Sequence, residues 1–295
     1  MARKRRRQSR KTSGSDFWAI VIIILFLLWF VSTKGGSDPS GHQTIERIGR
    51  NEPAKKNKID QAKPAAKVYG GLSQEDYAKL AKLDFKSGNE AYITVNNDKS
   101  TLIKNAWRVN RVIYANLDSL NRTSRSNTAF LEKRNVANDS LRVQQYVQPT
   151  AWHYNRRNGT QIYNRGHLIA YSVSAGIDQA GNFNPRNLSG DQNNPKNLFT
   201  QSAYSNQRVQ TIFESRVRKA LRENKRVIYQ ATPIFRGEEL MARGINLQAV
   251  STDGTLDFNV YLFNVQPGFS FNYQNGRAKV NREIQVKNEN QKAYY

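Results

Sequence analysis

The stretch Ile162-Tyr163-Asn164-Arg165-Gly166-His167-Leu168-Ile169-Ala170-Tyr171 sets a polar Asn-Arg-Gly-His tetrapeptide inside an apolar frame. This frame is typical of a strand, and Gly166 lets the backbone approach another element or a ligand closely. His167 is one of three histidines in the chain; His42 lies in a low-complexity segment, which leaves His153 and His167. Imidazole titrates near neutral pH, so any acid–base chemistry that uses histidine must draw on these two residues.

Polar residues downstream extend the candidate site. Asn206 begins a periodic, helix-like stretch, where its amide oxygen could bind a hard cation or simply cap the helix. Glu214 follows eight residues later, which in an α-helix is about 80° around and roughly 12 Å along the axis. That separation predicts a water between Glu214 and any cation on Asn206. Glu214 could equally belong to a solvated face, and Asn197 could be a loop amide after Asn194-Pro195.

The chain is strongly basic, with a formal net charge of +23 over 295 residues. Residues 1–16 hold seven of the basic residues and one acid, and the remainder still carries 39 basic against 22 acidic residues, a net charge of +17. Such a surface favours a polyanionic partner, because each neutralised phosphate releases condensed counterions. A generally basic protein, or one that binds an anionic membrane or wall polymer, would show the same composition.

Cysteine is absent from the sequence. Disulfides and thiolate metal sites are therefore excluded, and only nitrogen and oxygen ligands remain. Oxygen ligands favour a hard cation such as Mg²⁺ over a structural zinc ion.

The N-terminal region predicts a membrane segment. Residues 1–16 form a basic, cytoplasmic segment, and 17–33 form a single transmembrane signal-anchor whose apolar core runs from Phe17 to Val31. A cleaved signal peptide is the alternative, and cleavage would release the protein. Residues 34–67 read as a flexible linker with few large apolar residues, followed by a globular domain at 68–295.

Within the domain, Ser73 and Asp76 indicate a helix start, and 91–95, 226–231 and 256–265 read as strands. The clearest helix follows Asn206, with a predicted core-facing stripe at Val209, Ile212, Phe213, Val217, Ala220 and Leu221. Helices and strands do not alternate regularly, so the expected fold is α+β with a central antiparallel sheet flanked by helices.

The joint pattern of Arg165-Gly166-His167, Pro195-Lys196-Asn197, Ser205-Asn206-Gln207 and then Glu214 resembles the DNA/RNA non-specific endonuclease family. Those enzymes carry a ββα-metal (His-Me finger) site on an α+β scaffold. The likeness covers roughly residue 68 to the C-terminus. With the N-terminal segment added, the chain looks like a surface-anchored nuclease of Gram-positive bacteria, with its catalytic domain outside the cell membrane.

The resemblance implies that His167 is the general base and that Asn206 is the protein ligand of a single Mg²⁺, for which Mn²⁺ can substitute. It implies that Glu214 holds a metal-bound water and that Arg165 acts in catalysis and on the substrate phosphate. Substrate contacts are also expected at Asn197, which contacts the phosphate or supports the site, and at Asn164 and Gln207. DNA and RNA are the implied substrates, and no small organic cofactor is expected.

One residue departs from the family pattern, because Asn164 stands where the family usually has Asp. The loss of that carboxylate leaves room for a rival, a surface DNA-binding receptor that keeps the fold without catalysis. A wall-polymer-binding module would explain the charge but leaves the spacing of His167, Asn206 and Glu214 unexplained. Phosphate tracking is expected from the basic residues Arg156, Arg157, Arg165, Lys196, Arg208 and Arg216.

Overall fold

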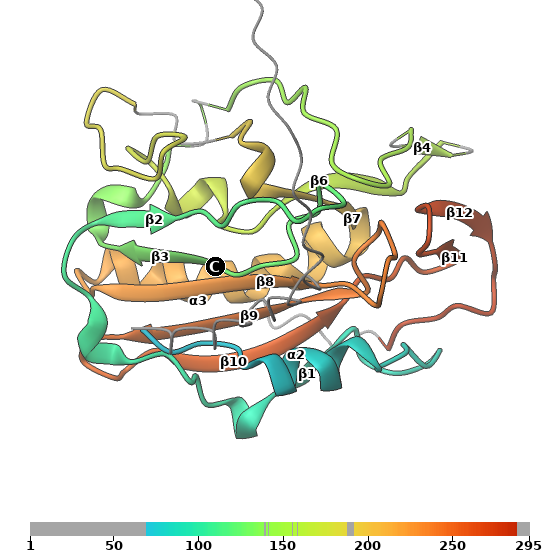
Figure 1. Cartoon of the computed structure of the whole chain (residues 1–295), viewed down its shortest axis with the longest axis horizontal. Coiled ribbons are helices and arrows are strands. Elements are labelled where there is room, and N and C mark those ends of the chain that lie inside the picture. The colour runs from blue at the N-terminus through green and yellow to red at the C-terminus, as the bar shows by residue number, and fades with distance from the viewer. Residues whose placement is uncertain are drawn as a thin grey trace, which may run out of the picture. The chain divides into compact units, whose positions relative to one another are not determined.

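Three long strands from the second half of the chain and three shorter ones from the first half build a six-stranded antiparallel sheet with the order β1-β10-β9-β8-β3-β2 (Figure 1). The computed structural model describes residues 69–287 except 139, 141, 155, 158 and 188–191. The strands are β1 (Tyr92–Thr94), β2 (Arg111–Ile113), β3 (Asn127–Leu131), β8 (Val227–Ile234), β9 (Gly244–Ser251) and β10 (Asp257–Phe263). Every residue of β8 and β9 is buried, so these strands form the centre of the fold.

Three two-stranded units accompany the sheet: β4 (Arg156–Arg157) with β5 (Thr160–Gln161), β6 (Tyr163–His167) with β7 (Leu198–Ser202), and β11 (Phe269–Asn272) with β12 (Arg277–Val280). The α-helices are α2 (Gln74–Ala81) and α3 (Thr211–Arg222), and Ser205–Gln210 is a π-helix that runs directly into α3. Short 3-10 turns occupy Asn96–Asp98, Lys104–Ala106, Lys133–Asn135, Tyr171–Val173 and Pro195–Asn197.

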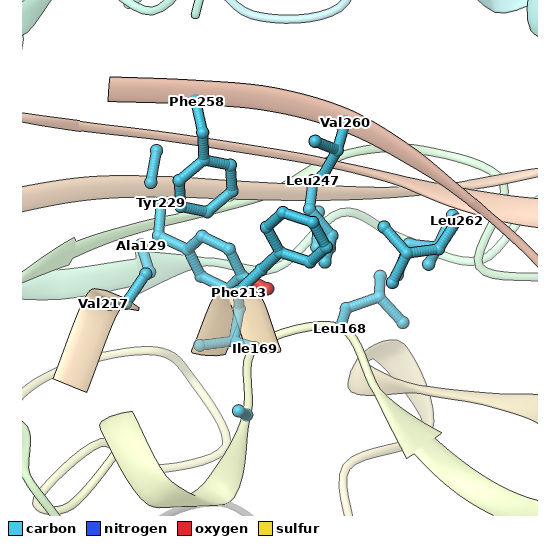
Figure 2. Close-up of a cluster of buried hydrophobic side chains, with 14 of the residues drawn as sticks. Ala129, Leu168, Ile169, Phe213, Val217, Tyr229, Leu247, Phe258, Val260 and Leu262 are labelled. Carbon is cyan, nitrogen blue, oxygen red and sulfur yellow. The ribbon is translucent and has the colours of Figure 1, made fainter. Parts of the chain in front are cut away.

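Helix α3 covers one face of the central sheet (Figure 1). Phe213 on α3 packs against Phe258 of β10 and Tyr92 of β1, with ring centroids 5.5 and 5.2 Å apart. Leu168 and Ile169, which follow directly after His167, are fully buried in the same cluster (Figure 2). The apolar frame after the tetrapeptide therefore anchors the end of β6 in the main core.

The opposite face of the sheet carries buried amides beside a small apolar cluster of Leu102, Phe130, Ile228 and Val250. Gln230 on β8 accepts a hydrogen bond from the Leu72 amide (3.0 Å), and Gln248 on β9 accepts one from the Thr101 amide (2.9 Å). Alternate residues of a strand point to opposite faces, so both glutamines point away from α3. These bonds hold the segments before and after α2 against the sheet. Because hydrogen bonds are directional, they fix the position of these segments more closely than apolar contacts alone would.

Most of the predicted elements are confirmed. Ser73 is the N-cap of α2 and accepts from the Asp76 amide, and β1, β8 and β10 occupy the three predicted strand regions. The central antiparallel sheet is also as expected, although it is accompanied by few helices. The strand that contains His167 ends at this residue, so Leu168–Tyr171 does not continue it.

Two details of the predicted helix are wrong. Ile212 is 38% exposed, because it lies about 100° from Phe213 around the helix, outside the buried face. Asn206 is not an N-cap, since it lies inside the π-helix after Tyr204.

The predicted basic segment (1–16), transmembrane segment (17–33) and linker (34–67) lie outside the described residues. Within the described part of the chain, no helix has both the length and the apolar character needed to cross a bilayer.

Candidate active site

Strands β6 and β7 and the helix after them bring the predicted site residues together. The two strands pair antiparallel, with Asn164 opposite Gln201, Gly166 opposite Phe199 and His167 opposite Leu198. The chain then turns through Ala203 and Tyr204 into the π-helix, which carries Asn206 and leads to Glu214 on α3. This strand–strand–helix arrangement is the ββα order that the resemblance implies.

The π-helix changes the geometry expected between Asn206 and Glu214. The expected angle of about 80° assumed an unbroken α-helix, whereas residues Ser205–Gln210 are π-helical. π-Helical turns are rare and occur frequently at functional sites. The α-helical calculation does not apply to the site, because part of the segment between Asn206 and Glu214 is π-helical. No periodicity in the sequence indicates this π-helix.

Asn206 is held by two other amides. Its Nδ2 donates to Gln201 Oε1 (3.0 Å), and its Oδ1 accepts from Asn164 Nδ2 (2.8 Å). Gln201 is fully buried and lies directly over Gly166, where a Cβ would come within 2.2 Å of Gln201 Oε1. The expectation that glycine is needed at 166 for a close approach is therefore confirmed.

His167 stands at the end of β6, half-buried, with its Nε2 3.2 Å from the backbone carbonyl of Gln192. A carbonyl oxygen can only accept, so the contact with Gln192 favours the tautomer in which Nε2 carries the proton and Nδ1 is unprotonated. No described residue hydrogen-bonds Nδ1. Gln145 Nε2 donates to the same carbonyl (3.2 Å) and lies 3.2 Å from the imidazole Nε2.

Burial lowers the pKa of His167 to about 4; the bond to Gln192 opposes this shift, and the charge of Arg142 adds to it. The imidazole is therefore neutral at pH 7 and able to accept a proton. His153, the other histidine of the described residues, lies 2.7 Å from the Asn275 carbonyl.

Glu214 has a largely buried side chain, with 12% of its surface exposed. Burial raises the pKa of its carboxyl, while the hydrogen bond from Gln210 (2.8 Å) and the positive charges of Arg218 and Arg142 lower it. The Tyr229 hydroxyl, near enough for the Glu214 charge to raise its pKa, is buried and has no hydrogen-bond partner among the described residues. Glu214 is therefore a partly desolvated acid and not a residue of a solvated face.

Arg165 is engaged within the protein. Its Nε donates to the Val147 carbonyl, its guanidinium lies 4.3 Å from the centroid of the Trp152 ring, and burial lowers its pKa. These contacts fix the direction of the side chain while leaving the other guanidinium nitrogens for a phosphate. The expected phosphate contact of Arg165 stays a prediction.

Asn197 cannot contact the substrate in this structure, because its side chain is fully buried. Its Oδ1 accepts from the Ile169 amide (2.9 Å), and its Nδ2 donates to the Ile169 carbonyl (3.0 Å). Asn197 thereby clamps the backbone two residues after His167. Of the two roles expected for it, substrate contact stays a prediction that this burial disfavours, and support of the site agrees with its position.

The remaining candidates differ in accessibility. Asn164 is half-buried and bonded to Asn206, whereas Gln207 is exposed on the π-helix. Among the basic residues, Arg156 and Arg208 are exposed. Arg216 packs over the Phe258 ring at 4.7 Å, so much of its guanidinium covers the core and is less suited to track a phosphate.

The donor set fits a small, hard cation. Asn206 offers an amide oxygen whose orientation is fixed by its neighbours, and Glu214 offers a carboxylate. The described residues contain no group of three or more His, Cys, Asp or Glu side chains that could enclose a metal. A cation held here would keep most of its water, as Mg²⁺ prefers.

Sequence reasoning missed Gln201, which holds Asn206, and five further residues that surround the site: Arg142, Gln145, Gln192, Gln210 and Arg218. Gln210 and Arg218 lie four residues on either side of Glu214, and that spacing on a helix could have identified them. Arg142 and Gln145 come from a segment more than 20 residues before His167, and Gln192 comes from the loop before β7. Only the folded chain brings these three residues near His167.

A neutral histidine, a buried acid and an oriented amide oxygen, surrounded by arginines, define the chain as a hydrolase of the phosphodiester-cleaving class. The DNA/RNA non-specific endonuclease model matches residues 100–253, a region that includes His167, Asn206 and Glu214. The chain belongs to the DNA/RNA non-specific endonuclease family.

Similar proteins agree with this assignment. The crystal structure of NucA from Streptococcus agalactiae with a magnesium ion bound is 30% identical, with a TM-score of 0.56, and the match covers 72% of this chain and 99% of that one. The metal-free NucA structure matches equally well, with the same identity and TM-score. A deoxyribonuclease from Streptococcus dysgalactiae subsp. equisimilis is 42% identical over 50 residues, which are 17% of this chain and 15% of that protein.

Proposed function

We propose that this protein is a membrane-anchored extracellular endonuclease that uses Mg²⁺ and His167 to hydrolyse DNA and RNA with little sequence specificity. The observation that carries the proposal is the network in which Gln210 Nε2 donates both to the His167 carbonyl (2.9 Å) and to Glu214 (2.8 Å), next to the oriented amide of Asn206. His167 thereby shares one site with Asn206 and Glu214, which follow 39 and 47 residues later in the sequence.

His167 is the general base. Its Nε2–H donates to the Gln192 carbonyl, which holds the ring and leaves Nδ1 as the free base. Nδ1 takes a proton from water as the water oxygen forms a bond to phosphorus and the bond to the 3′ oxygen breaks. The leaving oxygen takes a proton from solvent, which gives a 5′-phosphorylated product. General-base catalysis of this kind contributes about 10²–10⁴-fold.

Asn206 and Glu214 would hold the metal ion, Asn206 directly through Oδ1 and Glu214 through water. When bound, Mg²⁺ or Mn²⁺ supplies positive charge that stabilises the phosphate in the transition state. Two observations support Mg²⁺: the oxygen-only donor set of this chain, and the magnesium ion bound to the similar NucA. Glu214 is fixed by Gln210 and by Arg218, whose Nη1 lies 4.0 Å from its Oε2.

Low sequence specificity follows from the kind of contacts that the site offers. Basic side chains such as Arg165 and the exposed Arg208 meet phosphates, which carry no base sequence. Gln207, exposed beside Asn206, is the polar residue best placed to contact the substrate next to the cation. The net charge of +17 outside residues 1–16 supports attraction of nucleic acid from a distance.

The apolar run from Phe17 to Val31, which follows a dense basic block, supports the membrane anchor. The excess of basic residues before this run supports an orientation with the N-terminus in the cytoplasm and the nuclease domain outside. The polar segment 34–67 then acts as a tether that lets the domain reach its substrate.

The full-length chain should convert supercoiled plasmid to nicked and linear forms with Mg²⁺, and EDTA should stop the reaction. The same assay with single-stranded DNA and RNA tests the breadth of substrates. A surface DNA-binding receptor without catalysis would bind DNA in a salt-sensitive manner that EDTA does not change, and it would leave the plasmid intact. Intact plasmid in Mg²⁺ and in Mn²⁺ would refute the proposed function.

A further inference from the structure

A continuous row of side-chain amides runs through the site. Gln210 Oε1 accepts from Gln201 Nε2 (2.9 Å), Gln201 Oε1 accepts from Asn206 Nδ2 (3.0 Å), and Asn206 Oδ1 accepts from Asn164 Nδ2 (2.8 Å). Asn164 Oδ1 then accepts from Gln161 Nε2. We call Gln210, Gln201, Asn206, Asn164 and Gln161 the amide row.

The direction of the amide row is set at its buried end. Gln210 Nε2 donates to the backbone carbonyl of His167 (2.9 Å), and a backbone carbonyl can only accept. Nε2 of Gln210 must therefore face that carbonyl, so Oε1 faces Gln201. Gln201 must therefore donate to that oxygen through its own Nε2, which leaves its Oε1 to accept from Asn206.

The same logic fixes Asn206. Because Gln201 presents an oxygen, Asn206 must present Nδ2 to it, and Oδ1 of Asn206 is left facing away from the buried end. Rotating the Asn206 amide by half a turn would set its oxygen against Gln201 Oε1 and its NH₂ group against the NH₂ group of Asn164, so both hydrogen bonds would be lost. The identity of the atom that Asn206 presents is thus decided by the backbone of the catalytic histidine.

The row is rigid because its inner members have no alternative partners in water. Gln201, Gln210 and Ser205 are all fully buried, and Gln201 Nε2 also donates to Ser205 Oγ (3.1 Å). Gly166 provides the space in which Gln201 lies.

We infer that Gln201 and Gln210 are positioning residues, which orient Asn206 so that its oxygen, and not its NH₂ group, faces the cation. The inference rests on the proposed function, because the amide row can orient a metal ligand only if Asn206 binds the cation. It also links the metal ligand to the general base, since one glutamine bonds the His167 carbonyl, the Glu214 carboxylate and the next amide of the row. Neither glutamine needs to touch the substrate.

The test compares Gln201→Met and Gln210→Met with a matched control, Gln248→Met, in the full-length protein. Gln248 is also a fully buried glutamine with several hydrogen bonds, but it lies on the face of the sheet opposite α3. Isothermal titration calorimetry measures the Kd for Mg²⁺ alone, and thermal unfolding confirms that each variant is folded. Loss of residues that orient a metal ligand commonly weakens affinity about 10–100-fold.

The inference predicts that Mg²⁺ binding weakens at least about tenfold in both site variants and changes less than about twofold in Gln248→Met. Nicking by the site variants should recover partly at high Mg²⁺. If the wild-type protein binds Mg²⁺ and both site variants bind it with the same Kd, the positioning role of Gln201 and Gln210 is overturned. The proposed function is left intact by that result. A wild-type protein that binds no Mg²⁺ overturns both.

One measurement needs no substitution and decides the matter if the variants do not fold. In the wild-type protein, the side-chain NH₂ protons of Gln201 and Gln210 should exchange slowly with solvent, and the Asn206 NH₂ signal should shift when Mg²⁺ is added. Fast exchange of both glutamine amides, or an Asn206 signal indifferent to Mg²⁺, would overturn the inference.

Discussion

Replacing Asn197 by alanine separates the two roles that the sequence allows for this residue. In the structure, Asn197 Oδ1 accepts from the Ile169 amide and Nδ2 donates to the Ile169 carbonyl, and both residues are fully buried. Alanine removes both bonds and leaves two backbone groups buried without partners. Each such group costs about 1–3 kcal/mol, so the free energy of unfolding should fall by about 2–6 kcal/mol.

Urea denaturation followed by circular dichroism measures this loss, with Asn105→Ala as the control. Asn105 is exposed, so its replacement should change the free energy of unfolding by less than about 0.5 kcal/mol. If Asn197 clamps the backbone after His167, Asn197→Ala loses stability, and the folded fraction keeps the wild-type KM for DNA. A variant of wild-type stability with a raised KM would refute this reasoning and return Asn197 to the substrate contacts.

Two further predictions concern β6. Because burial depresses the pKa of His167 from 6.5 to about 4, the unfolded state binds more protons than the folded state between these values, and stability falls as the pH falls through this window. His167→Asn should flatten the pH dependence of the unfolding free energy there by up to about 1.4 kcal/mol per pH unit, as measured by denaturation from pH 4 to 7; equal slopes would contradict the burial of the imidazole. Gly166→Ala should push the Gln201 side chain aside, which lowers the free energy of unfolding by about 1–3 kcal/mol and weakens Mg²⁺ binding. A variant with the wild-type melting temperature and Mg²⁺ affinity would contradict the close approach of Gln201 to Gly166.

Local signals made part of the fold predictable. Ser73 caps α2 through a bond to an amide three residues away, so its whole interaction lies within one turn of sequence. The apolar run of β10 indicates a buried strand for the same reason, because burial of its side chains needs no particular partner.

Strand β9 escaped prediction because three of its eight buried residues, Asn246, Gln248 and Ser251, are polar. Asn246 and Gln248 read as surface residues, yet they are fully buried and bonded to each other, and their further partners lie on β10 and near Thr101. Such burial is favourable only when partners from distant parts of the chain satisfy each amide. Periodicity therefore cannot show it.

The site was predictable as a set of residues but not as an arrangement. The spacing of His167, Asn206 and Glu214 identified the family, since a motif depends on residue types at fixed intervals. The roles of Gln201 and Gln210 depend on the π-helix and on the pairing of β6 with β7. Both bring together residues that are more than 30 positions apart in the sequence. A π-helical turn is set by such contacts and has no periodic signal of its own.

The central claim is that the His167 imidazole removes a proton from the attacking water. The most direct measurement is the single-turnover rate of DNA cleavage at saturating Mg²⁺ by the wild-type protein and by His167→Ala, with Mg²⁺ affinity and thermal unfolding recorded for both. The account predicts a rate at least about a hundredfold lower in the variant, with Mg²⁺ still bound and the fold intact. Cleavage by a folded His167→Ala protein at a rate close to that of the wild type would contradict it.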